Sequence, residues 1–398
     1  TQVPRPSKRE GKIIEWLKAF AVKHNLEHTV DEAGNIIMRK PATPGYEDKP
    51  GVILQAHMDM VCEKNNDTVH DFDNDPIHTY IDGDFIKAQG TTLGADNGIG
   101  MALMLAAITS DTLKHPALEC LFTVDEETGL TGAFRLQDGC LQGKQFINLD
   151  SEDDGQVFIG CAGGIDTLAK MHYSPIALSP NSHLAIHLKV GGLMGGHSGD
   201  DINKGRGNAN KILVRFLYQV MQATDMQLAT INGGNLRNAI AREAEAVIAI
   251  PMAYKEDIRV MLNHYIATIE AEIGDVEKDF FMHLETTDMP ALFIPTDKAR
   301  VLIQALYACP HGMTAMSKTM PGLVETSTNL ASVKMKEDEK GAFVEINTSQ
   351  RSSIESKKHD IKQMVECALA LACDEVTHGD GYPGWAPNPQ SPLLEVTE

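Results

Sequence analysis

The chain has 398 residues, 42% of them hydrophobic and 23% charged, and a formal net charge of -20 at pH 7. This length exceeds what one ordinary hydrophobic core supports, so two domains are expected. The negative charge argues against nucleic acid or an anionic membrane surface as a partner. No stretch approaches the ~18 apolar residues of a membrane span. Seven scattered cysteines without a CxxC pair fit a reducing compartment, so a cytoplasmic location is predicted.

The first 150 residues alternate between helical and strand patterns. Residues 8–24 carry apolar side chains at helical spacing, behind a capping-box pattern formed by Ser7 and Glu10. A hairpin at 27–39 follows, and then the pattern predicts three buried strands near 51–56, 118–124 and 146–149. The almost entirely apolar stretch 101–108 indicates a helix that is buried on all sides. Alternating strands and helices are typical of an α/β sheet.

From residue 183 onward the pattern changes. The order strand, helix, strand, strand, helix occurs twice: at 183–190, 208–224, 226–231, 239–250 and 256–273, and again at 279–285, 297–308, 327–336, 342–349 and 356–373. Alternating apolar and polar residues in these strands suit a sheet with one wet face. We predict an α+β domain of residues 183–375, an antiparallel sheet with helices on one face. It is inserted into a first domain made of residues 1–182 and 376–398.

His57 and Asp59 stand at the end of the first buried strand. Residues two apart in an extended chain point to the same side, so both side chains can face one site. An imidazole that binds a metal, with a carboxylate that orients the ring, is a common pair in metal centres. The alternative is a strand-end histidine bonded to an aspartate for structural reasons.

Acids also follow the other predicted strands. Glu126 and Glu127 come after the second, Asp150 comes after the third, and Asp96 lies in the glycine-rich turn before the apolar helix. Ligand sites of open α/β sheets form beyond the carboxyl ends of the strands, and carboxylates gathered there need positive charge. One imidazole with several carboxylates suits Zn²⁺, Mn²⁺ or Co²⁺. Asp96 is the candidate bridge between two ions about 3.5–4 Å apart.

The neighbouring pair Glu126 and Glu127 would point in opposite directions in an extended chain. One of them can then bind a metal while the other acts as a base on water. Structural interpretations remain open for the other acids. Asp96 could cap a helix, and residues 150–154 could form a solvated acidic turn.

Three features of the predicted second domain are candidates for substrate contacts. His197 lies in a glycine-rich loop, from which it can donate a hydrogen bond to a developing oxyanion. Arg351 ends a strand, where it can hold a carboxylate through two parallel hydrogen bonds. Asn235 lies in a tight turn that carries amide side chains. A loop histidine, a surface arginine and an ordinary hairpin are the corresponding structural alternatives.

Several motifs together resemble the aminoacyl-histidine dipeptidases: QAHMDM, GTTLGADNGIGMA, FTVDEETGLTGA, INLDSED, GCAGGID, GGHSG and GNANK. These enzymes are dizinc peptidases related to carnosinases, aminoacylases and glutamate carboxypeptidases, and the resemblance runs over essentially the whole chain. It implies a zinc-peptidase-like α/β catalytic domain with an inserted α+β lid domain. It also implies hydrolysis of dipeptides, preferentially Xaa-His, and a homodimer as a further expectation.

The resemblance also implies roles for individual residues. Two divalent metal ions, zinc before manganese or cobalt, would be bound by four residues, with Asp96 as the bridge: His57, Asp96, Glu127 and Asp150. Asp59 would orient His57. Glu126 would be the general base that activates the water between the metals and later protonates the leaving amine.

The remaining roles implied by the resemblance concern the substrate. His197 would stabilise the oxyanion, in its own subunit or in a partner's site. Arg351 would hold the substrate's C-terminal carboxylate. Asn235 stays a further candidate for substrate contact.

The sequence departs from this family at one point. Family members carry a further metal-binding histidine in a C-terminal segment resembling HSPDE, and the 398 residues contain no such segment. We therefore expect part of the catalytic domain, including one metal ligand, to be missing from the C-terminus. Two alternative functions remain: an N-acyl-amino-acid deacylase on the same scaffold, and an inactive, truncated chain that binds at most one metal.

Overall fold

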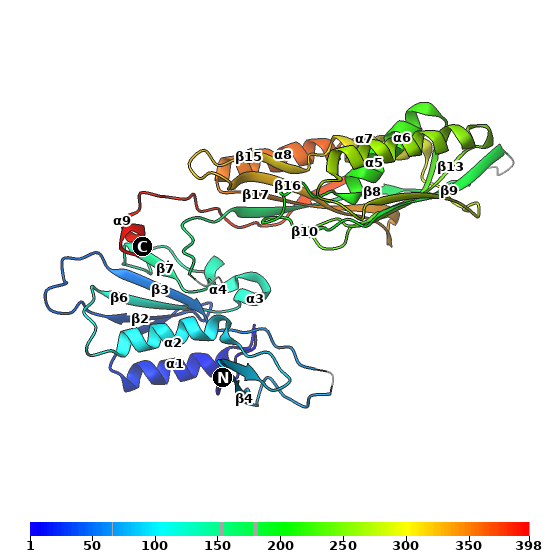
Figure 1. The fold of residues 1–398 in the computed structure, drawn as a ribbon. Helices are drawn as coiled ribbons and strands as arrows, with labels where there is room; N and C mark the ends of the chain where they lie inside the picture. Colours follow the sequence, from blue (N-terminus) through cyan, green and yellow to red (C-terminus); the bar gives the residue numbers. More distant parts are fainter. Residues whose placement is uncertain (66, 152–154, 178–181, 398) are drawn as a thin grey trace. The chain divides into compact units, whose positions relative to one another are not determined.

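The computed structural model describes residues 1–65, 67–151, 155–177 and 182–397, which form two compact units (Figure 1). The first unit comprises Thr1–Phe158 and the C-terminal residues from Glu395, and the second comprises Ile159–Leu394. The domain limits predicted from the sequence, 1–182 with 376–398 and 183–375, are not tested by these compact units and remain a prediction. The compact units have other limits because strand β8 (Gly163–Tyr173) and the segment around Tyr382 pair within the second unit.

The first unit is built on a five-stranded sheet with the order β1-β2-β6-β3-β7. Its strands are β1 (Glu27–Val30), β2 (Ile36–Lys40), β3 (Val52–His57), β6 (Leu118–Thr123) and β7 (Gln145–Asn148). Strand β3 runs parallel to both β6 and β7, so the three carboxyl ends lie at one edge of the sheet. A separate hairpin consists of β4 (Thr79–Asp82) and β5 (Phe85–Ala88).

Helices α1 (Gly11–Lys23) and α2 (Ala95–Thr109) pack on one face of this sheet, around a core that includes Met104 and Phe122. The prediction that the apolar helix is buried on all sides is wrong. The side chain of Leu103, within the predicted stretch 101–108 of α2, is 57% exposed. Only the face that carries Met104 is covered by the sheet and by α1.

The predicted capping box at the start of α1 is also wrong. The helix begins at Gly11, and no side chain caps it. The Ser7 hydroxyl instead donates to Asp59 Oδ2 (2.7 Å), and Glu10 Oε1 accepts from the backbone N–H of Asp125 (3.0 Å). Both polar side chains therefore bind the loops that follow β3 and β6. Two short helical turns, α3 (Glu126–Gly129) and α4 (Thr131–Phe134), come directly after β6.

The second unit contains a nine-stranded sheet with the order β14-β9-β13-β11-β16-β17-β8-β18, in which β15 also pairs with β16. Besides β8, its strands are β9 (His183–Gly191), β11 (Gln227–Gly233), β13 (Ala244–Pro251), β14 (Phe281–Thr287), β15 (Gly312–Met316), β16 (Val324–Asp338), β17 (Gly341–Ser352) and β18 (Glu375–His378). Neighbouring strands are antiparallel. A short ribbon of β10 (Gly196–His197) and β12 (Ala239–Ile240) stands apart from the sheet.

Four helices cover one face of the large sheet (Figure 1): α5 (Ala209–Ala223), α6 (Lys255–Ile273), α7 (Thr296–Ala308) and α8 (Glu355–Leu369). The predicted antiparallel sheet with helices on one face is thus confirmed, and the two predicted repeats contribute to a single sheet. The short elements η2 (Met252–Tyr254) and α9 (Pro392–Thr397) complete the list. In the described part of the chain, no helix combines the length and the apolar character needed to cross a bilayer.

His311 lies between α7 and β15, where its Nδ1 accepts a hydrogen bond from the backbone N–H of Leu330 (3.3 Å). Burial, helped by the nearby Lys211 ammonium, lowers the pKa of His311 from 6.5 to about 4. The unfolded chain therefore takes up this proton at a higher pH than the folded chain does. The resulting stability is fully present above pH 6.5 and is lost as the pH falls toward 4.

Replacing this histidine should flatten the acid dependence of the second unit. Between pH 7 and pH 4.5, the His311→Gln variant should lose about 2 kcal/mol less stability than the parent chain. The measurement is urea unfolding in a Trp16→Phe background, which leaves Trp385 of the second unit as the only tryptophan. Equal losses in variant and parent would exclude His311 as the group responsible.

Candidate metal centre

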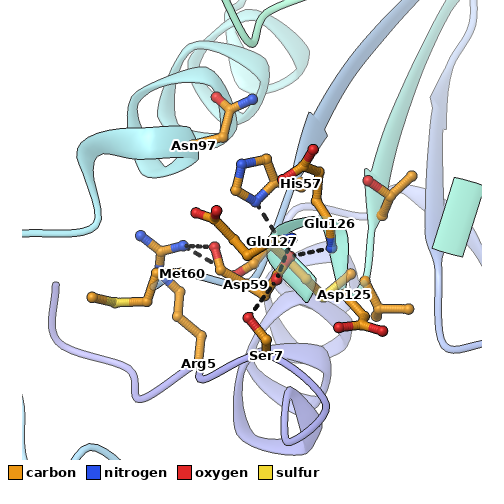
Figure 2. A network of polar contacts seen from close by, with 12 residues as sticks. Arg5, Ser7, His57, Asp59, Met60, Asn97, Asp125, Glu126 and Glu127 are labelled. Atoms are coloured by element: carbon orange, nitrogen blue, oxygen red, sulfur yellow. Dashed lines mark hydrogen bonds and ion pairs between the residues drawn. The ribbon is translucent and has the colours of Figure 1, made fainter. Parts of the chain in front are cut away.

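Asp59 is the fully buried carboxylate at the centre of the site (Figure 2). It follows β3 and accepts the backbone N–H groups of Glu126 on Oδ1 (3.0 Å) and Glu127 on Oδ2 (3.2 Å), together with the Ser7 hydroxyl. His57 Nδ1 lies 3.2 Å from Asp59 Oδ1. One carboxylate thus fixes the start of α3 and lies against the imidazole ring.

The other ring nitrogen of His57 faces two further carboxylates. Nε2 lies 2.8 Å from Asp96 Oδ1 and 3.4 Å from Asp150 Oδ1. The ring is buried, whereas the Asp96 and Asp150 side chains are partly exposed. Asp150 follows β7, and Asp96 lies at the start of α2. The structure therefore brings together three of the predicted metal ligands.

Asn97 orients one of these acids. Its Nδ2 donates to Asp150 Oδ1 (2.7 Å), and the residue is buried at the start of α2. The carboxylate of Asp150 is thereby held toward His57. The alternative of a solvated acidic turn at 150–154 rests partly on residues 152–154, which lie outside the described part of the chain.

Glu126 and Glu127 do not lie in an extended segment. The expectation that they point in opposite directions from a strand is wrong, because both belong to the helical turn α3. Asp125 precedes this turn in the left-handed region, with φ of 49°, and its carboxylate accepts the hydroxyl groups of Thr128 and Thr131. Both glutamates have carboxylate oxygens within 4.8 Å of a His57 ring nitrogen.

Burial and the neighbouring carboxylates together raise several pKa values at the site. Burial alone would lower the pKa of His57, but Asp150, Asp59 and Asp96 outweigh it and raise the pKa to about 11. Burial, reinforced by neighbouring acids, raises the pKa of Glu126 to about 7, although His57 opposes the shift. Burial also raises the pKa of Glu127, with Asp96 adding to the effect. The carboxylates around His57 therefore favour a positive charge at this place.

These residues fit a divalent metal ion by their chemistry. His57, Asp96 and Asp150 each offer a ligand atom within 4.8 Å of the others, and so do His57, Glu126 and Glu127. Imidazole nitrogen and carboxylate oxygen are ordinary ligands of Zn²⁺, Mn²⁺ and Co²⁺. The two groups share His57, so the five side chains form one continuous cluster.

Two other acidic groups in the described residues fit a metal less well. In the group of Glu10, Asp59 and Asp125, the carboxylates accept hydrogen bonds from backbone and hydroxyl donors. In the group of His172, Asp374 and Glu375, the imidazole is paired with Asp374 (2.7 Å) and Lys340 pairs with Glu375. Protein donors already satisfy both groups.

The second unit holds the three predicted substrate-contact residues, and two of them lie close together. A β-carbon built at Gly199 would lie 3.1 Å from His197 Cε1 and 3.5 Å from Arg351 Nη1, so the two side chains flank this glycine. Arg351 Nη1 also donates to the Tyr382 hydroxyl (3.2 Å). Within the described residues, the buried Arg351 Nε has no hydrogen-bond partner.

Asn235 is exposed on the loop between β11 and β12. It lines a cavity of about 600 Å³ together with Lys189, Arg242 and Lys334, whereas His197 and Arg351 do not belong to the lining. The contacts within the second unit therefore join His197 to Arg351 and leave Asn235 separate from them.

Arg5, Ser7 and Asn97 contact the site but were not predicted to belong to it. Arg5 is only 4% exposed, which is unusual for an arginine. The residues next to Arg5 in the sequence do not indicate which groups its side chain will contact. Asn97 directly follows Asp96, and this position is what indicates in the sequence that Asn97 lies near the metal ligands.

Comparisons with known proteins agree with this fold and cluster. The peptidase dimerisation domain family matches residues 188–277. The chain is 41% identical over 394 residues to the cytosol non-specific dipeptidase of Escherichia coli K12, covering 99% of this chain and 80% of the relative. Peptidase T of a Geobacillus strain is 31% identical over 145 residues, covering 29% of this chain and 34% of the relative.

A solved structure shares the same identity with the chain as the Escherichia coli relative does. The aminoacylhistidine dipeptidase of Vibrio alginolyticus gives a TM-score of 0.93 at 41% identity, covering 99% of this chain and 80% of that one. The fold and the sequence relatives define a peptidase with a dimerisation domain. More narrowly, the chain belongs to the aminoacylhistidine dipeptidase family.

Metal binding should stabilise the first unit. With Zn²⁺ at 100 times its dissociation constant, the unfolding free energy should rise by about 2.7 kcal/mol. His57→Ala should abolish the rise because it removes the shared ligand. His172→Ala is the matched control, since it removes a histidine from the other His–Asp–Glu group.

This stabilisation can be measured by urea unfolding with and without a chelator. A Trp385→Phe background leaves Trp16 of the first unit as the only tryptophan. An equal response to Zn²⁺ in His57→Ala and the parent chain would refute a metal centre at His57.

Proposed function

We propose that the protein hydrolyses dipeptides with a free amino group, preferentially Xaa-His, with the help of two divalent metal ions. The observation that carries this proposal is the cluster of His57 with the acids at the carboxyl ends of β3, β6 and β7. The names of the two relatives that share 41% identity with the chain support dipeptides as the substrate class.

Four side chains would hold the metal ions, with Asp96 as the bridge: His57, Asp96, Glu127 and Asp150. Zinc suits this donor set, and manganese or cobalt could replace it. When bound, the ions polarise the scissile carbonyl and make a water molecule more acidic.

Glu126 is the proposed general base. Its carboxylate takes a proton from the attacking water and returns it to the nitrogen of the leaving amine. Glu126 suits this role because its backbone N–H is fixed by Asp59, while its side chain lies near His57. Asp59 acts on the His57 ring, which it holds from the opposite side to Asp96.

The second unit supplies the proposed substrate contacts. His197 would donate a hydrogen bond to the oxyanion, and Arg351 would bind the C-terminal carboxylate of the dipeptide. The buried Nε of Arg351 has no hydrogen-bond partner among the described residues, and a carboxylate would satisfy it, which supports that role. Asn235 would contact the substrate from its exposed loop. Residues 183–375 would act as the lid domain.

Dimerisation and location also belong to the proposal. The match to a peptidase dimerisation domain supports a homodimer. The name of the Escherichia coli relative supports a cytoplasmic location. An N-acyl-amino-acid deacylase is not favoured by these relatives. Comparing alanyl-histidine with its N-acetylated form separates the two activities, because a dipeptidase requires the free amine.

Replacing the proposed base should separate catalysis from metal binding. Glu126→Gln should lower kcat for alanyl-histidine at least about 100-fold, because the amide cannot accept the proton from water. Bound metal, counted by atomic emission, should stay at the parent level. Glu63→Gln, which alters an exposed glutamate in the loop after β3, serves as the control. Parent-level kcat in Glu126→Gln would rule out its role as base.

A further inference from the structure

The N-terminal segment before α1 lies alongside the loop that follows β3. The backbone N–H of Met60 donates to the carbonyl of Arg5 (3.1 Å), and Pro6 forms a parallel bridge with Met60. The segment therefore extends past His57 and Asp59 without belonging to the main sheet.

The Arg5 side chain, which lies beside Asp59 in Figure 2, connects two loops of the metal centre. Its Nη1 donates to the carbonyls of Met58 (3.1 Å) and Asp59 (2.6 Å), and its Nη2 donates to the carbonyl of Gly94. Met58 and Asp59 directly follow β3, which ends at His57, and Gly94 precedes Asp96 at the start of α2. One guanidinium thus joins the backbone that carries His57 to the backbone that carries Asp96.

The glycine-rich turn is shaped around this guanidinium. A β-carbon at Gly94 would lie 2.7 Å from Arg5 Nη2, and one at Gly98 would lie 2.8 Å from the same atom. Gly94 also has a positive φ of 69°, whereas Gly98 does not belong to the positive-φ glycines. A side chain at position 98 would therefore meet the guanidinium of Arg5 and displace it.

Charge and hydrogen bonding both hold the N-terminal segment against the metal centre. The buried guanidinium is attracted to Asp59, Asp96 and Glu127. The Ser7 hydroxyl, two residues along the same segment, donates to Asp59 Oδ2 (2.7 Å). The segment therefore contacts the site through its backbone, a cation and a hydroxyl.

We propose that Arg5 is a positioning residue of the metal centre, which sets the spacing between His57 and Asp96 by bridging the carbonyls of Met58, Asp59 and Gly94. The inference rests on the proposed metal-binding function. A lysine could supply the charge, but its single ammonium lacks the planar fork that reaches carbonyls of two loops at once. In the Arg5→Lys variant, the two loops should no longer be joined, so the distance between His57 and Asp96 should no longer be fixed.

Titration of the metal-free chain with Co²⁺, followed by visible absorption, tests this without any substrate. Arg5→Lys and Arg5→Ala should both weaken Co²⁺ binding by about 10- to 100-fold, the usual effect of losing a group that supports metal ligands. Arg9→Ala is the matched control. It removes the same charge from the same segment, but Arg9 is exposed and pairs with Asp73. Its Co²⁺ affinity should equal that of the parent chain.

A second pair of variants guards against simple loss of folding. Gly98→Ala should weaken Co²⁺ binding in the parent chain, because its β-carbon displaces the guanidinium. In the Arg5→Ala background the same change should have little further effect, because the space is free. Equal losses in both backgrounds would contradict the proposed contact.

The outcomes separate this inference from the proposed function. Parent-level Co²⁺ affinity in Arg5→Lys would overturn the positioning role and leave the metal centre intact. A parent chain that binds no Co²⁺ would overturn both. Weakened binding in Arg5→Lys, with unchanged far-ultraviolet circular dichroism, supports the inference even if the chain hydrolyses no dipeptide.

Discussion

The buried carboxylate of Asp59 is the constraint around which the first unit is organised. Burial alone would raise its pKa, but His57, the Glu126 N–H and the Ser7 hydroxyl lower it to about 2. A buried charge is tolerated only when such partners surround it. Because these partners come from the N-terminal segment, from the end of β3 and from α3, satisfying one carboxylate fixes three separate pieces of chain.

The parallel register of the sheet brings the remaining groups to the same place. His57 pairs with Thr123 of β6, so Glu126 and Glu127 follow beside it. Gln55 pairs with Asn148 of β7, so Asp150, two residues further on, comes level with His57. A shift of the register by one residue would turn these side chains to the opposite face. The site therefore depends on the apolar strand cores as much as on the acids.

The sequence predicted those parts of the site that depend on local pattern. His57 and the acids stand directly after apolar strands, which is visible without any knowledge of contacts. Arg5 was missed because its partners are backbone carbonyls more than 50 residues away, which leave no mark on composition. Ser7 was misinterpreted because a serine three residues before a glutamate fits a capping box equally well.

The same distinction holds for the second unit. Its helices and most of its strands follow apolar periodicity, and they were predicted within a few residues. Strand β8 was not predicted, although Ile165, Thr167, Ala169 and Met171 alternate inward. Threonine and alanine weaken the apolar signal of that alternation. Because β8 joins β17 to β18, its omission also moved the predicted domain limits away from those of the compact units.

The charge balance of the cluster favours two divalent ions over one. Five carboxylates gather around a single imidazole: Asp59, Asp96, Glu126, Glu127 and Asp150. With His57 neutral, the Arg5 guanidinium offsets one of these charges and leaves four. Without cations, the excess appears as a pKa of about 11 at His57 and about 7 at Glu126, since protons are the only compensation left. One divalent ion would halve the excess, and two would remove it. Arg5 compensates the cluster from its buried side, and metal ions would compensate the partly exposed carboxylates of Asp96 and Asp150.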